Sequence, residues 1–231
     1  MLRRITIYSL LMVITGFSMA KDLTDDFLSM MGKYVKSNNI SIEGESFSYI
    51  QKSDVPVMQS DFSIKKCKGN TLYEDKYHTI IMKPLYDIWV DYSGKFIYLS
   101  YKVPNKQQSG KFMNPSNIFE MTRIHIKNCT VKNNATGGKE YTITYNPVLT
   151  DCIKSIVVMD KEENLKRIEY YFSEGTYLSK TVINYNSIST DPVNIEMFNE
   201  DKYLIKKDNK WITAKAYKNY KIHIFEYEKL F

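Results

Sequence analysis

Residues 86–101 read YDIWVDYSGKFIYLSY and give the clearest structural signal in the chain. Every second residue from Tyr86 to Tyr92 is apolar or aromatic, and the alternation resumes at Ile97 after the pair Ser93-Gly94. A period of two residues is that of a β-strand, in which side chains point to opposite faces in turn. Because a turn pair separates the two runs, the stretch predicts a β-hairpin.

Shorter runs of the same kind follow along the chain and, with the hairpin, predict about ten strands. They cover residues 62–67, 123–131, 141–145, 153–159, 165–172, 177–186 and 220–227. The breaks between them are short, as at residues 133–138, 160–164, 173–175 and 208–209. Breaks of this length join antiparallel neighbours, because a parallel crossover needs about a dozen residues or more. The expected sheet is therefore an antiparallel meander.

Three stretches have a different pattern from the strands. The first begins at the cap Thr24-Asp25-Asp26 and carries apolar residues at helical spacing, namely Phe27, Leu28, Met30, Met31, Tyr34 and Val35. It predicts an amphipathic N-terminal helix. Residues 104–120 and 191–203 are the other two, and both are expected to form flaps or short helices over one face of the sheet.

Several strands carry apolar residues on both faces, as in residues 96–101 and 168–172. A sheet with one wet face would alternate more cleanly, so both faces are expected to be covered. The sequence thus predicts a mainly β (α+β) fold, in which a curved antiparallel meander forms a half-barrel or barrel around the N-terminal helix and the short helical flaps. We expect one domain over residues 21–231, because no repeat or linker divides the chain.

The first twenty residues resemble a secretory signal. Arg3 and Arg4 precede an apolar run at residues 5–17, and the small residues Ser18 and Ala20 stand before Lys21. This pattern predicts a signal peptide that is cleaved after Ala20, with a retained anchor as the alternative. The apolar run is too short to span a bilayer comfortably, and no later segment approaches the roughly 20 apolar residues that a spanning helix needs. A periplasmic or secreted protein with no stable membrane span is expected.

Charge and composition restrict the partners. The net charge falls from +6 to +4 when the two charges of Arg3 and Arg4 are removed, and the remaining charges are interleaved. Only Arg123 and Arg167 then remain as arginines, although arginine is the residue that best recognises phosphate and guanine. Nucleic acid is therefore not expected as a partner. The 19 tyrosines fit strand positions, and they would also suit the wall of a cavity.

No pattern of catalytic or metal-binding residues stands out. His78, His125 and His223 are scattered through strand-like runs, without metal spacing or a neighbouring nucleophile motif. We therefore expect no enzyme activity, no metal and no cofactor. Cys67, Cys129 and Cys152 make an odd number in an exported protein, and Cys129 with Cys152 is the preferred disulfide pair, although sequence alone does not determine the pairing.

Residues 156–172 read IVVMDKEENLKRIEYYF, and a next strand ends in Asn184-Tyr185. This order of strand, acidic turn, strand and Asn-Tyr strand end resembles the periplasmic lipoprotein carriers of the LolA and LolB superfamily. The resemblance implies a half-barrel closed by helices, whose apolar concave face holds acyl chains. It also implies a lipid or an acylated protein as the partner.

On this resemblance, the apolar residues of two strand regions are candidates to line a ligand cavity, and others are candidates for its lid. The lining candidates are Trp89, Ile97, Leu99, Tyr101, Ile168, Tyr170 and Phe172. The lid candidates are Met30, Met31, Met197 and Phe198. Each of these residues would equally suit an ordinary core.

The leading hypothesis is a non-enzymatic carrier or binding protein of the cell envelope for lipid acyl chains or lipoproteins. The alternative is a structural or adhesive envelope protein with a filled core and a protein partner, which a large exposed apolar patch would favour. A hydrolase with a dispersed site is a third hypothesis. A cleft that brings one of the histidines beside a carboxylate or serine would favour it.

Overall fold

Strands make up most of the computed structural model, which describes residues 37–102 and 125–226. Twelve of the strands form one sheet in the order β14-β6-β5-β4-β3-β2-β1-β11-β10-β9-β8-β7. The two end strands, β14 and β7, are not paired with each other, so the sheet is not closed. The prediction of a mainly β, largely antiparallel fold is confirmed.

The chain divides into two compact units. Unit 1 contains Met1–Ser37, Gly44–Ser60 and Gly110–Ile188, and unit 2 contains Asn38–Glu43, Asp61–Ser109 and Ser189–Phe231. Strands β1 (Asn39–Ile50) and β2 (Met58–Cys67) contribute residues to both units. The single domain over residues 21–231 stays a prediction.

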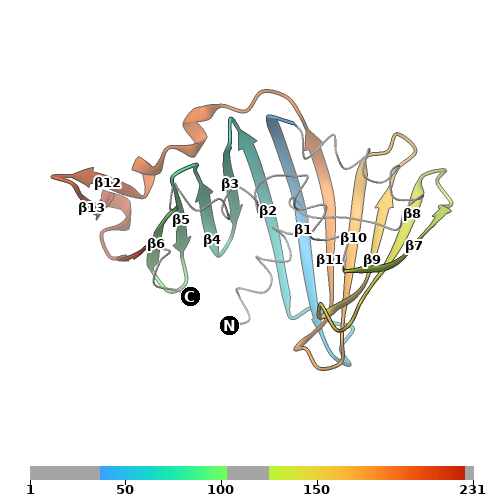
Figure 1. The fold of residues 1–231 in the computed structure, drawn as a ribbon. Helices are drawn as coiled ribbons and strands as arrows, with labels where there is room; N and C mark the ends of the chain where they lie inside the picture. The colour runs from blue at the N-terminus through green and yellow to red at the C-terminus, as the bar shows by residue number, and fades with distance from the viewer. Residues whose placement is uncertain (1–36, 103–124, 227–231) are drawn as a thin grey trace. The chain divides into compact units, whose positions relative to one another are not determined.

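Unit 1 presents five strands in sequence order, each antiparallel to the next (Figure 1). They are β7 (Ile126–Asn133), β8 (Lys139–Tyr145), β9 (Cys152–Met159), β10 (Leu165–Phe172) and β11 (Leu178–Ser189). The sequence predicts β10 residue for residue, because Asn164 and Ser173 end the apolar run on either side. Every element that the structure describes in this unit is a strand of the sheet.

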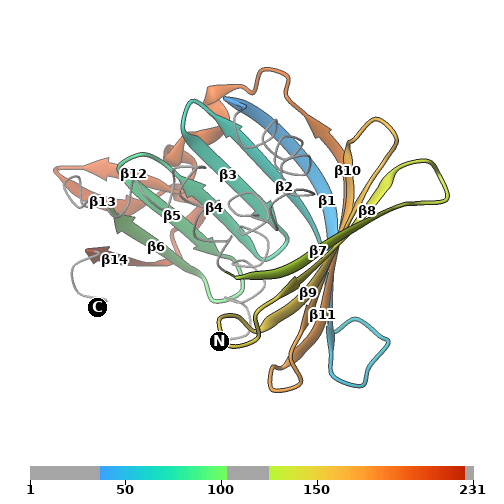
Figure 2. The same cartoon turned by 45° about the vertical axis from the view of Figure 1, so that its right-hand side comes forward.

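Unit 2 contains the predicted hairpin and the strands beside it (Figure 2). They are β3 (Asn70–Asp75), β4 (His78–Met82), β5 (Tyr86–Asp91), β6 (Phe96–Tyr101) and β14 (Lys221–Glu226). The Asp91 carboxylate accepts hydrogen bonds from the backbone N–H groups of Ser93 and Gly94, each at 2.9 Å, and so closes the turn between β5 and β6. The hairpin prediction is confirmed.

A second layer covers one face of the sheet in unit 2. It contains three 3-10 helices, η1 (Ile195–Phe198), η2 (Glu200–Lys202) and η3 (Lys215–Tyr217), and the hairpin of β12 (Leu204–Lys207) and β13 (Lys210–Thr213). Phe198, Tyr203 and Leu204 from this layer join Ile88, Val90, Ile97 and Leu99 of the sheet in one buried cluster. The core of unit 2 is therefore filled by its own chain.

The last strand differs from the predicted meander. Strand β14 pairs with β6 in parallel, with Ile222 opposite Ile97 and Ile224 opposite Leu99. A parallel pair needs a long connection, and here β14 follows the whole covering layer rather than a tight turn. The sequence run at residues 220–227 is thus a strand, but its direction was predicted wrongly.

The predicted helical parts have different outcomes. The N-terminal helix and the stretch at residues 104–120 lie outside the described residues. Residues 191–203 are described, and they form only the short turns η1 and η2, whose caps are the side chains of Asn194 and Asn199. Among the residues that the structure describes, no helix is both long and apolar enough to cross a membrane.

Glu200 ties the covering layer of unit 2 to the sheet. Its carboxylate forms an ion pair with Lys83 and accepts a hydrogen bond from the Tyr86 hydroxyl. Burial alone would raise the pKa of Glu200, but the hydrogen bonds from Lys83 and Tyr86 outweigh burial and hold the pKa below its usual value. This contact therefore stabilises the charged form of the carboxylate.

Because the folded-state pKa of Glu200 is lowered, its contribution to stability is present above the unfolded-state pKa and is lost as the pH falls through the folded-state value. We expect Glu200→Gln to cost about 1 kcal/mol at pH 7, the typical value of such a hydrogen-bonded contact. The cost should shrink as the pH falls through the lowered folded-state pKa, because wild-type Glu200 then becomes protonated. Urea unfolding across pH 3–7 checks this, and a cost that does not depend on pH would contradict it.

Candidate functional site

One face of strands β8 to β11 in unit 1 is lined by apolar side chains. Tyr141, Val157, Ile168 and Ile183 lie opposite one another in register across these four strands. Val157, Ile168 and Ile183 are 0% exposed, and Tyr141 is 2% exposed. In unit 2 the same degree of burial comes from a covering layer, whereas all described elements of unit 1 belong to the sheet itself. We call this surface the apolar face of unit 1.

The opposite face of the same strands is charged. Glu169 lies 3.1 Å from Arg167 and 3.9 Å from Lys180, and it accepts a hydrogen bond from the Tyr171 hydroxyl at 2.5 Å. The Lys154 ammonium lies 4.0 Å from the centre of the Tyr171 ring. This face suits water, so the sheet of unit 1 is strongly two-sided, with one apolar face and one ionic face.

A row of hydroxyl groups crosses the apolar face next to the row that contains Val157, Ile168 and Ile183. Tyr170 on β10 lies opposite Thr181 on β11 and, on its other side, opposite Ser155 on β9. The Thr181 hydroxyl shares a 3.2 Å hydrogen bond with Ser48 on β1, and the Ser155 hydroxyl shares a 2.8 Å hydrogen bond with Tyr145. The apolar face thus combines a hydrocarbon-like row with a polar row one residue pair further along the strands.

Burial keeps the tyrosine hydroxyls of this row protonated. It raises the pKa of Tyr170, with the nearby Tyr185, Tyr145 and Cys152 adding to the effect. Burial also raises the pKa of Tyr145, and it raises that of the Cys152 thiol to about 12. At neutral pH these groups are uncharged and can donate hydrogen bonds.

The structure divides the predicted lining and lid residues between the two units. Ile168, Tyr170 and Phe172 lie on β10 in unit 1, the first two buried and the third half-buried. Ile97, Leu99, Met197 and Phe198 belong to the filled core of unit 2 or pack against it. Met30 and Met31 lie outside the described residues.

Trp89 and Tyr101 belong to unit 2. Trp89 is on β5, with ring centroids 5.6 Å from His78 and 5.7 Å from Tyr98. The Tyr101 hydroxyl, at the end of β6, accepts a 2.6 Å hydrogen bond from the indole of Trp211 on β13. Tyr101 thereby helps to hold the covering layer of unit 2.

One histidine does lie beside a carboxylate. His78 Nδ1 is 3.4 Å from Asp75 Oδ1, but His78 is only 3% exposed. Asp75 also accepts hydrogen bonds from the Tyr73 hydroxyl at 2.8 Å and from the backbone N–H groups of Tyr77 and His78 at 2.7 and 2.6 Å. These bonds account for Asp75 as the cap of the turn between β3 and β4. Because both carboxylate oxygens of Asp75 already accept these hydrogen bonds, the pair does not favour the hydrolase hypothesis.

The preferred disulfide is corrected by the structure, in which Cys67, Cys129 and Cys152 are all free thiols. Cys129 on β7 lies opposite Ile143 on β8, which lies opposite Ser155 on β9, three residues from Cys152. A whole strand therefore separates the two cysteines, and two strand spacings are roughly 10 Å, beyond the reach of a disulfide. Among the described residues, no group of three or more His, Cys, Asp or Glu could hold a metal ion.

Several residues of the apolar face were not among the sequence candidates. Tyr141, Val157 and Ile183 lie in the same row as Ile168, and Ser155 and Tyr145 form the polar contact beside Tyr170. The signal for them was the strand register, because residues two apart share a face and the short turns align neighbouring strands. Combining the alternation of β8, β9 and β11 with that of β10 would have found the row.

No protein-family model matches the chain, and no curated protein matches it. Solved structures do match. An uncharacterised conserved protein from Thermus thermophilus has a TM-score of 0.48 and 6% identity, over 87% of this chain and 98% of that one. A LolA superfamily protein from Nitrosomonas europaea has a TM-score of 0.30 and 9% identity, over 72% of this chain and 92% of that one. LprF from Mycobacterium bovis has a TM-score of 0.37 and 9% identity, over 74% and 96%. The structural neighbours thus include the superfamily that residues 156–185 resemble.

Proposed function

We propose that the protein is a non-enzymatic carrier or binding protein for lipid acyl chains or acylated proteins, and that it works in the periplasm or outside the cell after cleavage behind Ala20. The observation that carries the proposal is the apolar face of unit 1, with three side chains at 0% exposure in one row across the sheet. The proposed lining is Ile168, Tyr170 and Phe172, extended to Val157 and Ile183. The half-barrel with a helical lid, including Met30 and Met31, is part of the same proposal.

The physical gain from such a face is sufficient for binding. Each buried methylene contributes about 0.8 kcal/mol, so about ten of them contribute about 8 kcal/mol before the entropic cost of association. Before that cost is subtracted, this energy corresponds to a dissociation constant of about 1 μM, which is therefore the tightest binding that ten methylenes would give. A face lined by Val, Ile and aromatic side chains can therefore hold an acyl chain in water without any covalent bond.

The direct test is to purify the chain from Lys21 onward, examine it by native mass spectrometry, and extract and identify bound lipid. A fluorescent fatty-acid analogue is then titrated into the delipidated protein. Bound lipid, or saturable binding of the analogue, is the expected result. If neither is found, the carrier function is excluded.

A matched pair of variants locates the binding surface. Ile168 in unit 1 and Ile97 in unit 2 are both 0% exposed and both lie on strands. Each Ile→Val change removes one methylene and should cost about 1 kcal/mol of folding stability. Only Ile168→Val should also weaken binding of the fluorescent analogue, by about fourfold, since a lost methylene contact is about 0.8 kcal/mol. Equal affinities for the two variants would remove the apolar face of unit 1 as the site.

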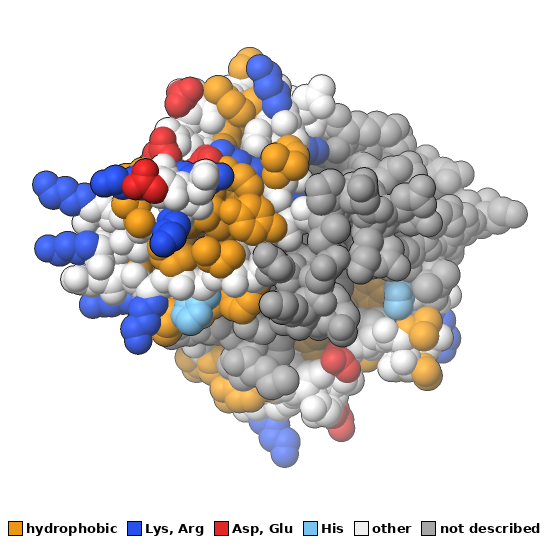
Figure 3. Space-filling model, turned by 60° about the vertical axis from the view of Figure 1, so that its left-hand side comes forward, with side chains coloured by type: hydrophobic (Ala, Val, Ile, Leu, Met, Phe, Trp, Pro, Cys, Tyr) orange, Lys and Arg blue, Asp and Glu red, His pale blue; other side chains and the backbone are white. Residues whose placement is uncertain are grey.

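The alternative, an envelope protein with a protein partner, is favoured by exposed apolar residues in unit 2. Ile212 is 43% exposed, Ile224 is 52% exposed and Phe225 is 37% exposed. Figure 3 shows hydrophobic side chains gathered on one surface, with Lys or Arg side chains beside them. A surface of this kind, on an edge strand such as β14, is typical of protein contacts. If the purified protein contains no lipid and does not bind the fluorescent analogue, this alternative is favoured over the carrier function.

A further inference from the structure

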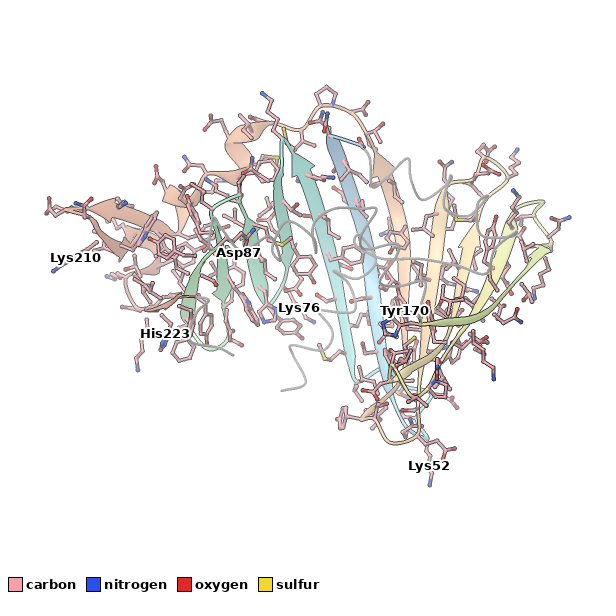
Figure 4. All side chains as sticks on the ribbon, in the orientation of Figure 1. Lys52, Lys76, Asp87, Tyr170, Lys210 and His223 are labelled. Carbon is pink, nitrogen blue, oxygen red and sulfur yellow. The ribbon has the colours of Figure 1, made fainter. Side chains whose placement is uncertain are left out.

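Tyr170 is a buried tyrosine whose hydroxyl forms no hydrogen bond within the described fold. The residue is 7% exposed, and its hydroxyl oxygen is fully buried without a hydrogen-bond partner among the described residues. Figure 4 labels Tyr170 within the sheet of unit 1. Buried polar atoms are nearly always paired, and leaving one unpaired destabilises the fold. Phenylalanine would fill the same volume without this cost, so the hydroxyl requires an explanation.

The neighbouring hydroxyls are already engaged with each other. Thr181, opposite Tyr170 on β11, is paired with Ser48, and Ser155, opposite on β9, is paired with Tyr145. Tyr170 stands between these two pairs in register and belongs to neither. The row therefore contains two hydrogen bonds and one hydroxyl, that of Tyr170, which has no partner among the described residues.

The chemistry of this donor defines its acceptor. Burial holds the Tyr170 pKa well above its usual value, so the phenol is protonated and neutral at physiological pH. The apolar row of Ile183, Ile168 and Val157 lies one residue pair away on the same face. A ligand that satisfies both must carry a hydrogen-bond acceptor at the end of a hydrocarbon chain, and an acyl carbonyl oxygen is such a group.

We infer that the Tyr170 hydroxyl donates a hydrogen bond to the acyl carbonyl oxygen of the ligand, whether that carbonyl belongs to an ester or to a free fatty acid. This inference rests on the proposed function and deepens it, because it assigns the chain and its carbonyl to adjacent rows of one face. The hydrocarbon row holds the chain, and Tyr170 distinguishes an acyl group from a plain alkane.

The test measures displacement of the fluorescent fatty-acid analogue by three competitors with twelve-carbon chains: lauric acid, methyl laurate and dodecane. The variant is Tyr170→Phe, and the control is Tyr171→Phe, whose hydroxyl is bonded to Glu169 on the ionic face. Tyr170→Phe should lower the affinity for lauric acid, for methyl laurate or for both by about tenfold, since that is about what one hydrogen bond contributes. Dodecane should bind the wild type and Tyr170→Phe equally. Tyr171→Phe should bind all three competitors like the wild type.

The outcomes separate the inference from the carrier function. Loss with lauric acid alone assigns the acceptor to a free acid, and loss with methyl laurate assigns it to an ester. Unchanged affinities for all three competitors in Tyr170→Phe would overturn the inference and leave the carrier function standing. A wild-type protein from which no competitor displaces the analogue would overturn both.

Two further measurements do not depend on the affinity of the variant. Thermal unfolding of ligand-free Tyr170→Phe should occur at the wild-type temperature or above it, because no internal hydrogen bond is lost; a clear drop would reveal an internal partner and overturn the inference. Infrared spectroscopy of lauric acid and of methyl laurate, each with a ¹³C carbonyl carbon, should show a hydrogen-bonded C–O stretch for at least one of the two ligands in the wild type. Free stretches for both would overturn the inference.

Discussion

Gly138→Ala is expected to lower the free energy of unfolding by about 2–3 kcal/mol, as overpacking a rigid site does. A Cβ atom on Gly138 would lie 2.1 Å from the carbonyl oxygen of Met159 and 2.8 Å from the carbonyl carbon of Asp160. Both are backbone atoms at the end of β9, so no side-chain rotation relieves the contact. Urea unfolding followed by circular dichroism measures the loss.

The surrounding hydrogen bonds explain why the backbone cannot move aside. The Asn134 N–H donates to the Gly138 carbonyl at 2.8 Å, and the Gly138 N–H donates to the Asn134 side-chain carbonyl at 2.8 Å. The Asn134 side-chain amide in turn donates to the Met159 carbonyl at 3.1 Å. Moving Gly138 away from β9 would therefore break the bonds that hold this turn closed.

Two other glycines of unit 1 serve as controls. A Cβ on Gly175 would meet no atom within 4 Å, and Gly175→Ala should change stability by less than about 0.5 kcal/mol. Gly137 also has open space but a φ of +81°, so Gly137→Ala should fall between the two, at about 1 kcal/mol. If Gly138→Ala costs no more than Gly175→Ala, the close approach to β9 is wrong.

The glycine pair shows how far the sequence could be interpreted. The break at residues 133–138, which contains Gly137 and Gly138, was predicted to join antiparallel neighbours, and it does connect the antiparallel strands β7 and β8. What each glycine does was not predictable, because it depends on the strand that packs beside the turn. The turn itself is predictable from neighbouring residues. The close approach of Gly138 to the backbone of Met159 and Asp160 depends on residues about twenty positions away.

The candidate site shows the same division. Alternation correctly assigned Ile97, Leu99, Ile168 and Tyr170 to strands, since periodicity is a local property. It could not tell which apolar face receives a covering layer from the chain itself. That depends on which face of the sheet residues 189–220 pack against. In the structure, Phe198 and Leu204 of this segment share a buried cluster with Ile97 and Leu99. The direction of β14 was missed for the same reason.

Phe198→Ala is expected to cost about 3–5 kcal/mol, the range for removing a buried phenylalanine side chain. Phe198 is 2% exposed and is the residue of η1 that enters the core of unit 2, beside Ile88, Leu99 and Leu204. The backbone of η1 is fixed by its cap, in which the Asn194 side chain accepts a 3.0 Å hydrogen bond from the Glu196 N–H. The truncated side chain would thus leave a cavity that η1 cannot close.

The matched control is Ile195→Ala in the same turn, because Ile195 is 42% exposed and should change stability by less than about 0.5 kcal/mol. The comparison also separates two roles for Phe198. If Phe198 is a lid over a ligand, Phe198→Ala should leave the stability of the ligand-free protein unchanged and alter binding of the fluorescent analogue. If Phe198 is a core residue, Phe198→Ala should lower the urea midpoint of the ligand-free protein, and the protein that remains folded should bind the analogue with unaltered affinity. The packing of Phe198 against Ile88 and Leu99 requires the second result, and a stable variant with changed affinity would contradict it.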